Sequence, residues 1–482
     1  MSAYEAVIGL EVHVHLATAS KLFCSCPNSF GDEPNTNVCE VCSGMPGVLP
    51  VLNRKAVEYA SRMAMAIEAT INQRSQFARK NYFYPDLPKG YQTSQLYLPI
   101  ARDGALTIAL EDGRKKTVGI CEMHMEEDAG KLLHDARNGQ TGVDYNRCGV
   151  PLIEIVTRPD FRDGDEVVAY LEELRCVLQY LGVSDCKLQE GSLRCDVNLS
   201  VRRSGSDRLG TRTEMKNLGS FRAVRRAIQY ESRRQIEVLE AGGQVVQETR
   251  WWDEDRNESV SMRSKEDARD YRYFPEPDLP PLSLDEGYLN ALRAQQPELA
   301  GEKRERYSRE FGLSAYDASM IAGQRTLAEF FEQTVALGVA PKEVANWILG
   351  PVLRQLSQRN MQAGDMPLRP GSLARIIKLV QAGRVNRNTA VQVFDAVFDG
   401  GDPEEYVRAN GLEQVSDVEQ MNGAVERVLR ENPDPVADFR AGKEKCFGFL
   451  VGQTMRLLGG KADPKQVNAL LREQLLKEEN GE

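Results

Sequence analysis

Alternation between apolar and ionisable residues predicts several β-strands in roughly the first 220 residues of the chain. In residues 7–16 the aliphatic side chains fall on one side of the expected strand, whereas Glu11, His13 and His15 fall on the other. The same two-residue period recurs in residues 120–126, 151–156, 193–201 and 212–217. The polar sides of these segments carry Glu122, His124, Glu126, Glu154, Asp196, Asn198 and Glu214. The pattern predicts a sheet with one apolar face and one face rich in carboxylates.

Helical periodicity begins after a proline-rich segment at residues 274–281. This segment cannot continue a helix or a central strand, so it predicts the first domain boundary. Apolar residues then recur at three- and four-residue spacing, as in residues 326–336 and 373–381. A break near residues 400–403 predicts a last helical unit of roughly 80 residues. We therefore expect an α+β fold with three domains, at residues 1–290, 291–405 and 406–482.

The carboxylate-rich face allows two interpretations. A solvated face of a half-buried antiparallel sheet would explain any single strand. Repetition across five segments favours a cation site, because crowded carboxylates repel one another unless a cation holds them. Hard oxygen ligands favour magnesium or manganese, and metal clamping of a polyphosphate is a common use of such a site. The chain contains no G-x-x-x-x-G-K-[ST] motif, which argues against a P-loop nucleotide site.

Composition narrows the class of protein. The 482 residues are 41% hydrophobic and 27% charged, which is ordinary for a globular chain of two or three domains. The formal net charge of −10 argues against a globally basic nucleic-acid coat and leaves room for a local basic stripe. No segment has the pattern of a signal peptide or the length of a membrane span, so we expect a cytoplasmic protein without a membrane partner.

Four cysteines near the N-terminus form two close pairs. Cys24 and Cys26 are separated from Cys39 and Cys42 by twelve residues, enough to close two turns around one tetrahedral ion. Four thiolates would leave no open coordination position, so the expected ion is a structural Zn²⁺. The alternative is a set of incidental thiols, because the first pair is Cys-x-Cys and not the commoner Cys-x-x-Cys.

A predicted helix at residues 221–236 carries an arginine stripe. Phe221, Val224 and Ile228 form its apolar row, whereas another face carries Arg222, Arg226 and Arg233, with Arg225 at its edge. Guanidinium groups in such a row suit phosphate contacts. An exposed charged face without a partner explains the row equally well.

Six longer motifs together resemble one known family, the B subunits of the tRNA-dependent amidotransferase. The motifs are IGLEVH at residues 8–13, KNYFYPD at 80–86, HMEEDAGK at 124–131, EGSLRCD at 190–196, KNLGSF at 216–221 and DYRYFPEP at 270–277. The resemblance implies a cradle domain with a glutamine-synthetase-like antiparallel sheet, followed by a helical domain and a tail domain. It also implies an ATP-dependent reaction that phosphorylates the side-chain carboxylate of glutamate or aspartate misattached to tRNA-Gln or tRNA-Asn, after which ammonia displaces the phosphate.

The resemblance also implies catalytic and metal-binding roles for particular residues. Glu11, His13, Glu126 and Glu127 are the expected catalytic residues and Mg²⁺ ligands, and Glu154, Asp196 and Glu214 are expected to complete the metal-binding face. His15 either joins the ligands or lies beyond the metal, and His124 either joins them or orients its neighbours. Lys80, Tyr82, Tyr84, Lys89 and Tyr91 either line an entry for ammonia and the acceptor end or belong to an ordinary packed loop.

The same resemblance implies partners. Ammonia would come from an amidase A subunit, helped by a small C subunit in a heterotrimer, and the matching non-discriminating aminoacyl-tRNA synthetase is a further candidate partner. In the tail the expected tRNA contacts are Lys443, Lys445, Arg456, Lys461 and Lys465, with a packed helical corner as the alternative. Two other functions remain open: an ATP-dependent ligase for a free small carboxylate, and a non-enzymatic tRNA adapter whose carboxylates hold a structural ion.

Overall fold

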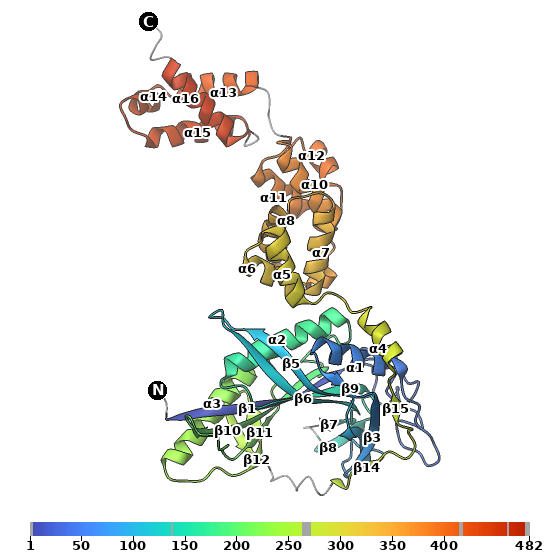
Figure 1. Cartoon of the computed structure of the whole chain (residues 1–482). Coiled ribbons are helices and arrows are strands. Elements are labelled where there is room, and N and C mark those ends of the chain that lie inside the picture. The colour runs from blue at the N-terminus through green and yellow to red at the C-terminus, as the bar shows by residue number, and fades with distance from the viewer. Residues whose placement is uncertain (1–2, 136–137, 263–270, 414–417, 460–461, 478–482) are drawn as a thin grey trace. The chain divides into compact units, whose positions relative to one another are not determined.

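The computed structural model describes residues 3–135, 138–262, 271–413, 418–459 and 462–477 (Figure 1). The chain divides into two compact units, Met1–Leu299 and Ala300–Glu482. The first unit contains the large sheet, and the described part of the second consists of helices with their connections. This confirms a mixed α+β fold with a helical C-terminal region.

The large sheet has nine strands in the order β13-β12-β11-β10-β1-β9-β6-β5-β2. Their bounds are β1 (Tyr4–His15), β2 (Thr70–Ile71), β5 (Ala101–Ala109), β6 (Lys115–Glu127), β9 (Pro151–Thr157), β10 (Leu193–Arg203), β11 (Thr213–Lys216), β12 (Glu248–Asp253) and β13 (Glu258–Ser261). The five strands expected from the alternating pattern are β1, β6, β9, β10 and β11. Neighbouring strands pair antiparallel except β11 and β12, which are parallel. The sheet is therefore mixed, where a purely antiparallel one was expected.

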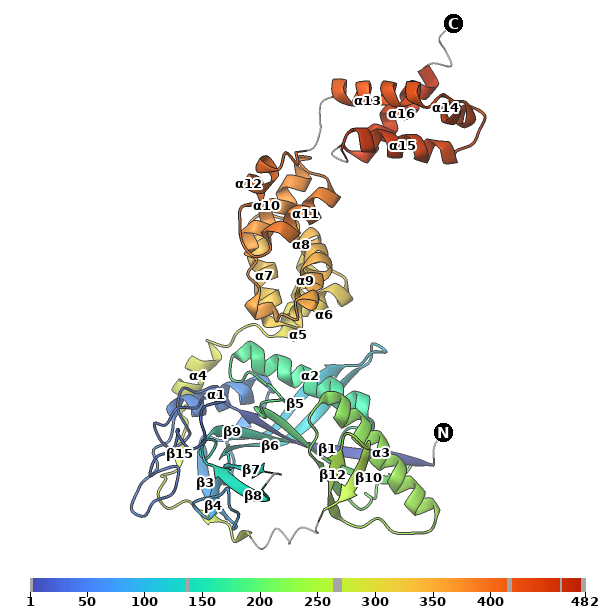
Figure 2. The ribbon, with the colours of Figure 1, turned by 180° about the vertical axis from the view of Figure 1, so that it is seen from behind.

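The apolar face of this sheet packs on three helices. Ile8, Leu10 and Val12 in β1 are at most 1% exposed and share one core with buried residues of the helices. The helices are α1 (Arg54–Ala66), α2 (Gly164–Leu181) and α3 (Phe221–Glu240) (Figure 2). Asp163 and Ser220 cap α2 and α3, because their side chains accept hydrogen bonds from backbone N–H groups of the first turns. Covering one face by helices leaves the carboxylate-bearing face, called the polar face below, on the other side.

A smaller sheet lies in the same unit. It contains β3 (Arg74–Asn81), β4 (Tyr91–Leu98), β14 (Phe274–Pro275) and β15 (Leu282–Ser283), and a separate hairpin is formed by β7 (Lys131–Asp135) and β8 (Gln140–Asp144). The proline-rich segment thus pairs with β3, and the side chain of Glu276 binds Arg79 at 2.7 Å. Together with α4 (Glu286–Arg293), this segment belongs to the first unit.

The second unit starts with a run of helices: α5 (Ala300–Phe311), α6 (Ala315–Ala322), α7 (Arg325–Ala336), α8 (Pro341–Trp347), α9 (Leu353–Gln358), α10 (Pro370–Gln381), α11 (Arg387–Val397) and α12 (Pro403–Ala409). Helices α7 and α10 confirm the two helical patterns expected there. The last four helices are α13 (Val418–Glu431), α14 (Pro433–Arg440), α15 (Lys445–Leu457) and α16 (Pro464–Lys477), and their buried residues form a hydrophobic cluster. Among the described helices, not one has the length and apolarity needed to cross a bilayer.

Candidate functional site

The register of the sheet brings the predicted site residues together at its centre. Strand β1 lies between β9 and β10, so that Glu11 is opposite Asp196 and His13 is opposite Glu154. Strand β6 pairs with the other edge of β9 and places His124 opposite Glu154. Side chains more than 100 residues apart in the sequence therefore share the polar face.

His13, Glu126 and Glu154 form one group, called the His13 group below. Each offers one ligand atom, and these atoms lie within 4.8 Å of one another. His13 Nε2 is 3.7 Å from Glu154 Oε1, and both side chains are about one-fifth exposed, so that an ion can reach them from solvent. Glu126 is almost completely buried and accepts hydrogen bonds from Ser94 Oγ and from Gln92 Nε2, the latter at 3.2 Å. Strand β4 thereby fixes Glu126.

The electrostatics of the His13 group favour a cation. Burial and the charge of Glu126 raise the pKa of Glu154 to about 8, because two carboxylates held together in a low dielectric resist ionising together. Burial lowers the pKa of His13, although the charge of Glu126 opposes the shift. A neutral imidazole is the form that binds a metal. A divalent cation would offset both carboxylates, so the donor set fits Mg²⁺ or Mn²⁺.

Glu11, Asp196 and Glu214 form a second group, called the Glu11 group, whose ligand atoms also lie within 4.8 Å of one another. A lysine is in contact with this group: Lys216 Nζ lies 2.5 Å from Asp196 Oδ2 and 3.1 Å from Glu214 Oε1. Burial opposes the charge of Lys216, but the two carboxylates outweigh it and raise the pKa of the ammonium group. The Glu11 group thus has part of its charge balanced from within.

Neutral donors hold two further carboxylate oxygens of the Glu11 group. Asn198 Nδ2 donates to Glu11 Oε1 at 2.9 Å, and Thr249 Oγ1 donates to Glu214 Oε2 at the same distance. A cavity of about 270 Å³ lies beside this group. It is lined by small and aliphatic residues of β1 and β9 together with Glu11, Asn198 and Arg212. The arginine and the apolar wall make this cavity suitable for a nucleotide.

Glu127, His15 and His124 lie outside both groups. Glu127 follows Glu126 directly in β6, so strand alternation turns its side chain to the opposite side. There its carboxylate binds Lys89 and accepts from the backbone N–H of Thr93 at 3.0 Å. His15 Nε2 is 2.7 Å from Asp128 Oδ2.

His124 is also engaged. Its Nδ1 contacts the backbone carbonyl of Gln95, and its Nε2 is 3.2 Å from Glu122 Oε1. The hydrogen bond with Glu122 and the charges of nearby glutamates outweigh burial and raise the pKa of His124. This residue therefore contacts a neighbouring carboxylate instead of joining the His13 group.

The four cysteines come together in the long loop between β1 and α1. The Sγ atoms of Cys24, Cys26, Cys39 and Cys42 all lie within 4.8 Å of one another, a set called the cysteine cluster below. The backbone N–H of Cys39 donates to Cys42 Sγ at 3.2 Å. Hydrogen bonding from Cys24 and the charge of Lys21 lower the pKa of Cys42 to about 4, although burial opposes the shift. The same hydrogen bond with Cys42 raises the pKa of Cys24, so the thiolate character lies on Cys42. Four convergent thiols, one of them with thiolate character, are compatible with a structural metal ion.

The predicted phosphate-binding arginines of α3 divide into two kinds. Arg225 binds Asp165 at 2.7 Å and Arg226 binds Glu254 at 2.9 Å, so both already have carboxylate partners. Arg222 and Arg233 are exposed. The arginine row is therefore available to a partner only at these two positions.

Of the predicted tRNA contacts in the tail, four are described and exposed: Lys443, Lys445, Arg456 and Lys465. Lys443 lies 2.8 Å from Asp438. Lys445 and Arg456 belong to α15, whose Gly448 is exposed as well. Lys461 lies outside the described residues.

Two features of the site escaped the sequence reasoning. Lys216 follows Glu214 by two residues in the same strand, so the alternation itself was a signal that this cation shares the carboxylate face. Tyr271 and Tyr273 belong to an aromatic row with Tyr82, in which the rings meet edge to face. Burial raises the pKa of Tyr273, and the charges of Glu126 and Glu154 add to the shift. Only folding brings these rings near the His13 group.

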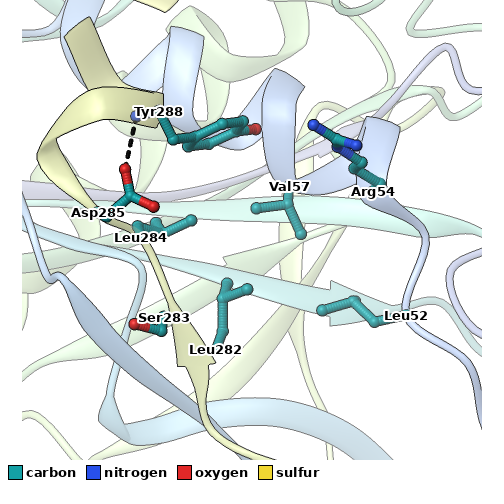
Figure 3. A pocket seen from close by; sticks show the side chains of 8 residues that line it. All are labelled: Leu52, Arg54, Val57, Leu282, Ser283, Leu284, Asp285 and Tyr288. Carbon is teal, nitrogen blue, oxygen red and sulfur yellow. Dashed lines mark hydrogen bonds between the residues drawn. The ribbon is translucent and has the colours of Figure 1, made fainter.

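A separate cavity of about 340 Å³ lies between α1, β15 and α4 (Figure 3). Its walls are mostly apolar, with Leu52, Val57 and Leu282 among them, and Arg54 lies at its side. The predicted site residues do not line it. This cavity therefore does not belong to the polar-face site.

Comparison with known proteins shows the family of the chain. Residues 6–290 match the family described as the GatB/GatE catalytic domain, and residues 329–475 match the GatB domain. The chain is similar to proteins named as B subunits of the aspartyl/glutamyl-tRNA(Asn/Gln) amidotransferase. It is 54% identical to the one from Lachnoclostridium phytofermentans over 478 residues, which cover 99% of this chain and 100% of the relative. The corresponding proteins of Solidesulfovibrio magneticus and Carboxydothermus hydrogenoformans are 52% and 49% identical, over 98% and 99% of this chain and the whole of each relative. The chain therefore belongs to the family of tRNA-dependent amidotransferase B subunits.

Proposed function

We propose that the polar face catalyses ATP-dependent amidation of glutamate or aspartate misattached to tRNA-Gln or tRNA-Asn. In the first step a side-chain carboxylate oxygen of the tRNA-bound amino acid attacks the γ-phosphorus of ATP, and ADP leaves. In the second step ammonia adds to the acyl carbon, the bond from that carbon to the phosphate oxygen breaks, and the leaving phosphate takes one proton from the nitrogen. The first step transfers a charged phosphoryl group and the second has phosphate as its leaving group, so the protein acts mainly through positioning and electrostatics.

The observation that carries this proposal is the convergence of His13, Glu126 and Glu154 in a chain of this family. A bound Mg²⁺ would neutralise charge on the transferring phosphoryl group. The protein's own part is to hold the three side chains from β1, β6 and β9, with Ser94 and Gln92 fixing Glu126. Glu11, Asp196 and Glu214 offer a second set of oxygen ligands, with lower need for an ion because Lys216 is present.

The cavity beside Glu11 supports a nucleotide position next to these ligands. Its aliphatic wall suits a base, and Arg212 suits a phosphate. Glu11 lines this cavity and His13 lies two residues further along the same strand, so phosphates bound beside Glu11 would lie on the face that carries the His13 group. The finer description of residues 1–290 as a cradle with a glutamine-synthetase-like sheet rests on the family resemblance and is part of the proposal.

Glu127 is part of the proposal in a different position. Its carboxylate pairs with Lys89 and lies outside both groups. Binding of Mg²⁺ by Glu127 therefore stays a prediction. Lys80 Nζ lies 5.0 Å from the ring centroid of Tyr271, and Lys89 Nζ lies 4.9 Å from that of Tyr91. We propose that these lysines and tyrosines line the entry by which ammonia or the acceptor end of the tRNA reaches the polar face.

The remaining parts of the proposal concern metal and partners. The cysteine cluster would hold one structural Zn²⁺, because four thiolates close its coordination sphere. As a B subunit, the chain would act with an amidase A subunit that supplies ammonia and with a small C subunit. We propose that residues 291–405 form the helical domain and that the tail, at 406–482, contacts the body of the tRNA.

Trapping the acyl phosphate tests the function directly. The complex is incubated with ATP, Mg²⁺ and glutamate misattached to tRNA-Gln, with hydroxylamine in place of an ammonia source. We expect a hydroxamate on the tRNA-bound amino acid and ADP in equal amount. Controls use correctly charged tRNA and free glutamate. ADP formation with free glutamate would indicate a small-molecule ligase, and no ADP formation with any substrate would leave a tRNA adapter.

A further inference from the structure

A completely buried lysine touches the cysteine cluster. Lys21 lies three residues before Cys24, and its side chain is 0% exposed. Its Nζ donates to the backbone carbonyl of Asn37 at 2.6 Å and to that of Tyr145 at 3.5 Å. The third contact is with Cys42 Sγ, at 3.6 Å. The ammonium group is thus enclosed by two carbonyls and one thiol.

Burial of this ammonium group requires negative charge nearby. An isolated charge transferred from water to a protein interior costs several kcal/mol unless an opposite charge compensates it. The two carbonyl partners are neutral. Within the described part of the chain, Lys21 forms no ion pair with a carboxylate, which leaves the cysteine cluster as the nearest source of negative charge.

We propose that Lys21 is the charge-balancing residue of a metal–thiolate centre, an inference that rests on the structural zinc site proposed above. Zn²⁺ with four thiolates carries two net negative charges. One ammonium group in contact with Cys42 Sγ halves that charge and donates a hydrogen bond to a ligand atom. Groups that hydrogen-bond metal ligands fix their orientation and tune the affinity of the site. Lys21 is therefore a positioning residue for the metal centre.

The segment that carries Lys21 also joins the cluster to the end of β6. The backbone N–H of Leu22 donates to the carbonyl of Gly149 at 2.8 Å, and the N–H of Gly149 donates to the carbonyl of Asp128 at 3.0 Å. Gly149 has a φ of +80°, and a Cβ atom there would lie 3.4 Å from Cys42 Cβ and 3.9 Å from Glu127 Oε2. The cluster thus packs directly behind the strand end that carries Glu126 and Glu127.

Two substitutions of Lys21 test the proposal in the full-length chain. Lys21→Gln removes the charge and keeps a hydrogen-bond donor, whereas Lys21→Arg keeps the charge. Zinc affinity is measured by competition with a chromophoric chelator at neutral pH. We expect Lys21→Gln to bind zinc about 10- to 100-fold more weakly than the wild type, and Lys21→Arg to stay within about threefold. The matched control is Lys55→Gln, which removes the charge of a half-exposed lysine on the surface of α1.

Each outcome decides one part of the argument. A wild-type chain without zinc affinity contradicts the structural zinc site itself. A wild-type chain that binds one zinc, with an equally tight Lys21→Gln variant, overturns the role of Lys21 alone. If Lys21→Gln does not fold, Lys21→Arg decides: affinity within threefold of the wild type supports the charge requirement, and a tenfold or larger loss overturns it.

Discussion

The two acidic groups of the polar face balance their charge differently at the level of single residues. The ammonium group of Lys216 contacts both Asp196 and Glu214, so a side chain of the protein itself offsets part of the negative charge of the Glu11 group. In the His13 group, burial and the charge of Glu126 raise the pKa of Glu154, and burial disfavours the protonated form of His13. The His13 group is therefore the site at which an added Mg²⁺ would gain the most.

This difference predicts the effect of Glu126→Gln. The substitution keeps the shape and the contact with Ser94 but removes one charge from the proposed metal site. We expect amidation by the assembled complex to fall about 100-fold or more, since one lost electrostatic contact to a transition state commonly costs that much. Glutaminase activity of the proposed A subunit should persist in part. Glu122→Gln, on the same face and one-third exposed, should retain most of the activity. Normal amidation by Glu126→Gln would remove the His13 group from the mechanism.

A second prediction concerns Glu231, which is completely buried in α3. Burial opposes its ionisation, but hydrogen bonds from Arg234 and Gln235 and the charge of Arg250 outweigh burial and lower its pKa. Glu231→Gln removes the buried carboxylate that Arg234 and Arg250 share and leaves Glu248 as their remaining charge partner, so we expect the unfolding free energy of the first unit to fall by about 3 kcal/mol at pH 7. Tryptophan fluorescence reports this unfolding, because Trp252 is buried against Tyr230.

The pH dependence of the same variant has a definite sign. A carboxylate whose folded-state pKa lies below its unfolded value stabilises the fold at pH above that unfolded value, about 4.5 for glutamate. This contribution disappears as the pH falls through the folded-state pKa. The difference between the wild type and Glu231→Gln should therefore be full at pH 7 and shrink below pH 4.5. Glu254→Gln, which breaks an exposed pair with Arg226, should cost less than about 1 kcal/mol at either pH. A constant difference across the range would mean that the charge of Glu231 is not what stabilises the unit.

The residues of the polar face could be predicted from the sequence because alternation alone assigns each side chain to a face. Alternation also explains why Glu127, one position after Glu126, lies outside both groups. The division into two groups depends on which strands pair, and His15 is bound by Asp128 through contacts that no local pattern reveals.

At the scale of elements, the loop between β1 and α1 depends on its cysteines. We predict that the purified wild-type chain contains one zinc per chain and that the double variant Cys24→Ser, Cys39→Ser contains almost none. Structural zinc in small peptides contributes on the order of 10 kcal/mol, so the loop should become sensitive to proteolysis once the ion is lost. Elemental analysis and limited proteolysis measure the two effects. Cys446→Ser, far along the chain in α15, serves as the control, and zinc clearly below one equivalent in the wild type would refute the site.

Some strands and helices could be predicted from the sequence, whereas others could not. Five strands were found because each has one apolar side, and α3, α7 and α10 were found because their apolar residues recur at helical spacing. The parallel pair β11 and β12 was not expected, because the α3 crossover that permits it is a property of the connection and not of either strand. The short strands β14 and β15 contain or follow prolines, and only their pairing with β3 defines them.

At the scale of the whole molecule, the tail predicts a salt-dependent contribution to tRNA binding. Lys445, Arg456 and Lys465 are exposed, and each phosphate contact contributes about 0.7 to 0.9 to the slope of log affinity against log salt. Changing all three to alanine should weaken binding of misacylated tRNA and flatten that slope by about 2. Lys342→Ala, at an exposed position in α8, should change neither. Unchanged affinity at two salt concentrations would mean that the tail does not contact tRNA through these residues.

The central place of β1 has a consequence for how this protein is made. Its partner β10 begins about 180 residues later in the chain, and ribosomes add about 5 to 20 residues each second. One pairing edge of β1 therefore waits on the order of 10 to 40 seconds for β10 during translation, and its other neighbour, β9, also follows more than 130 residues later. An unpaired, aliphatic strand is a template for wrong pairing, so nascent chains should need a chaperone until β10 has emerged. The pairing of β1 with the distant β10 assembles the site, and until that pairing forms the nascent chain is prone to aggregation.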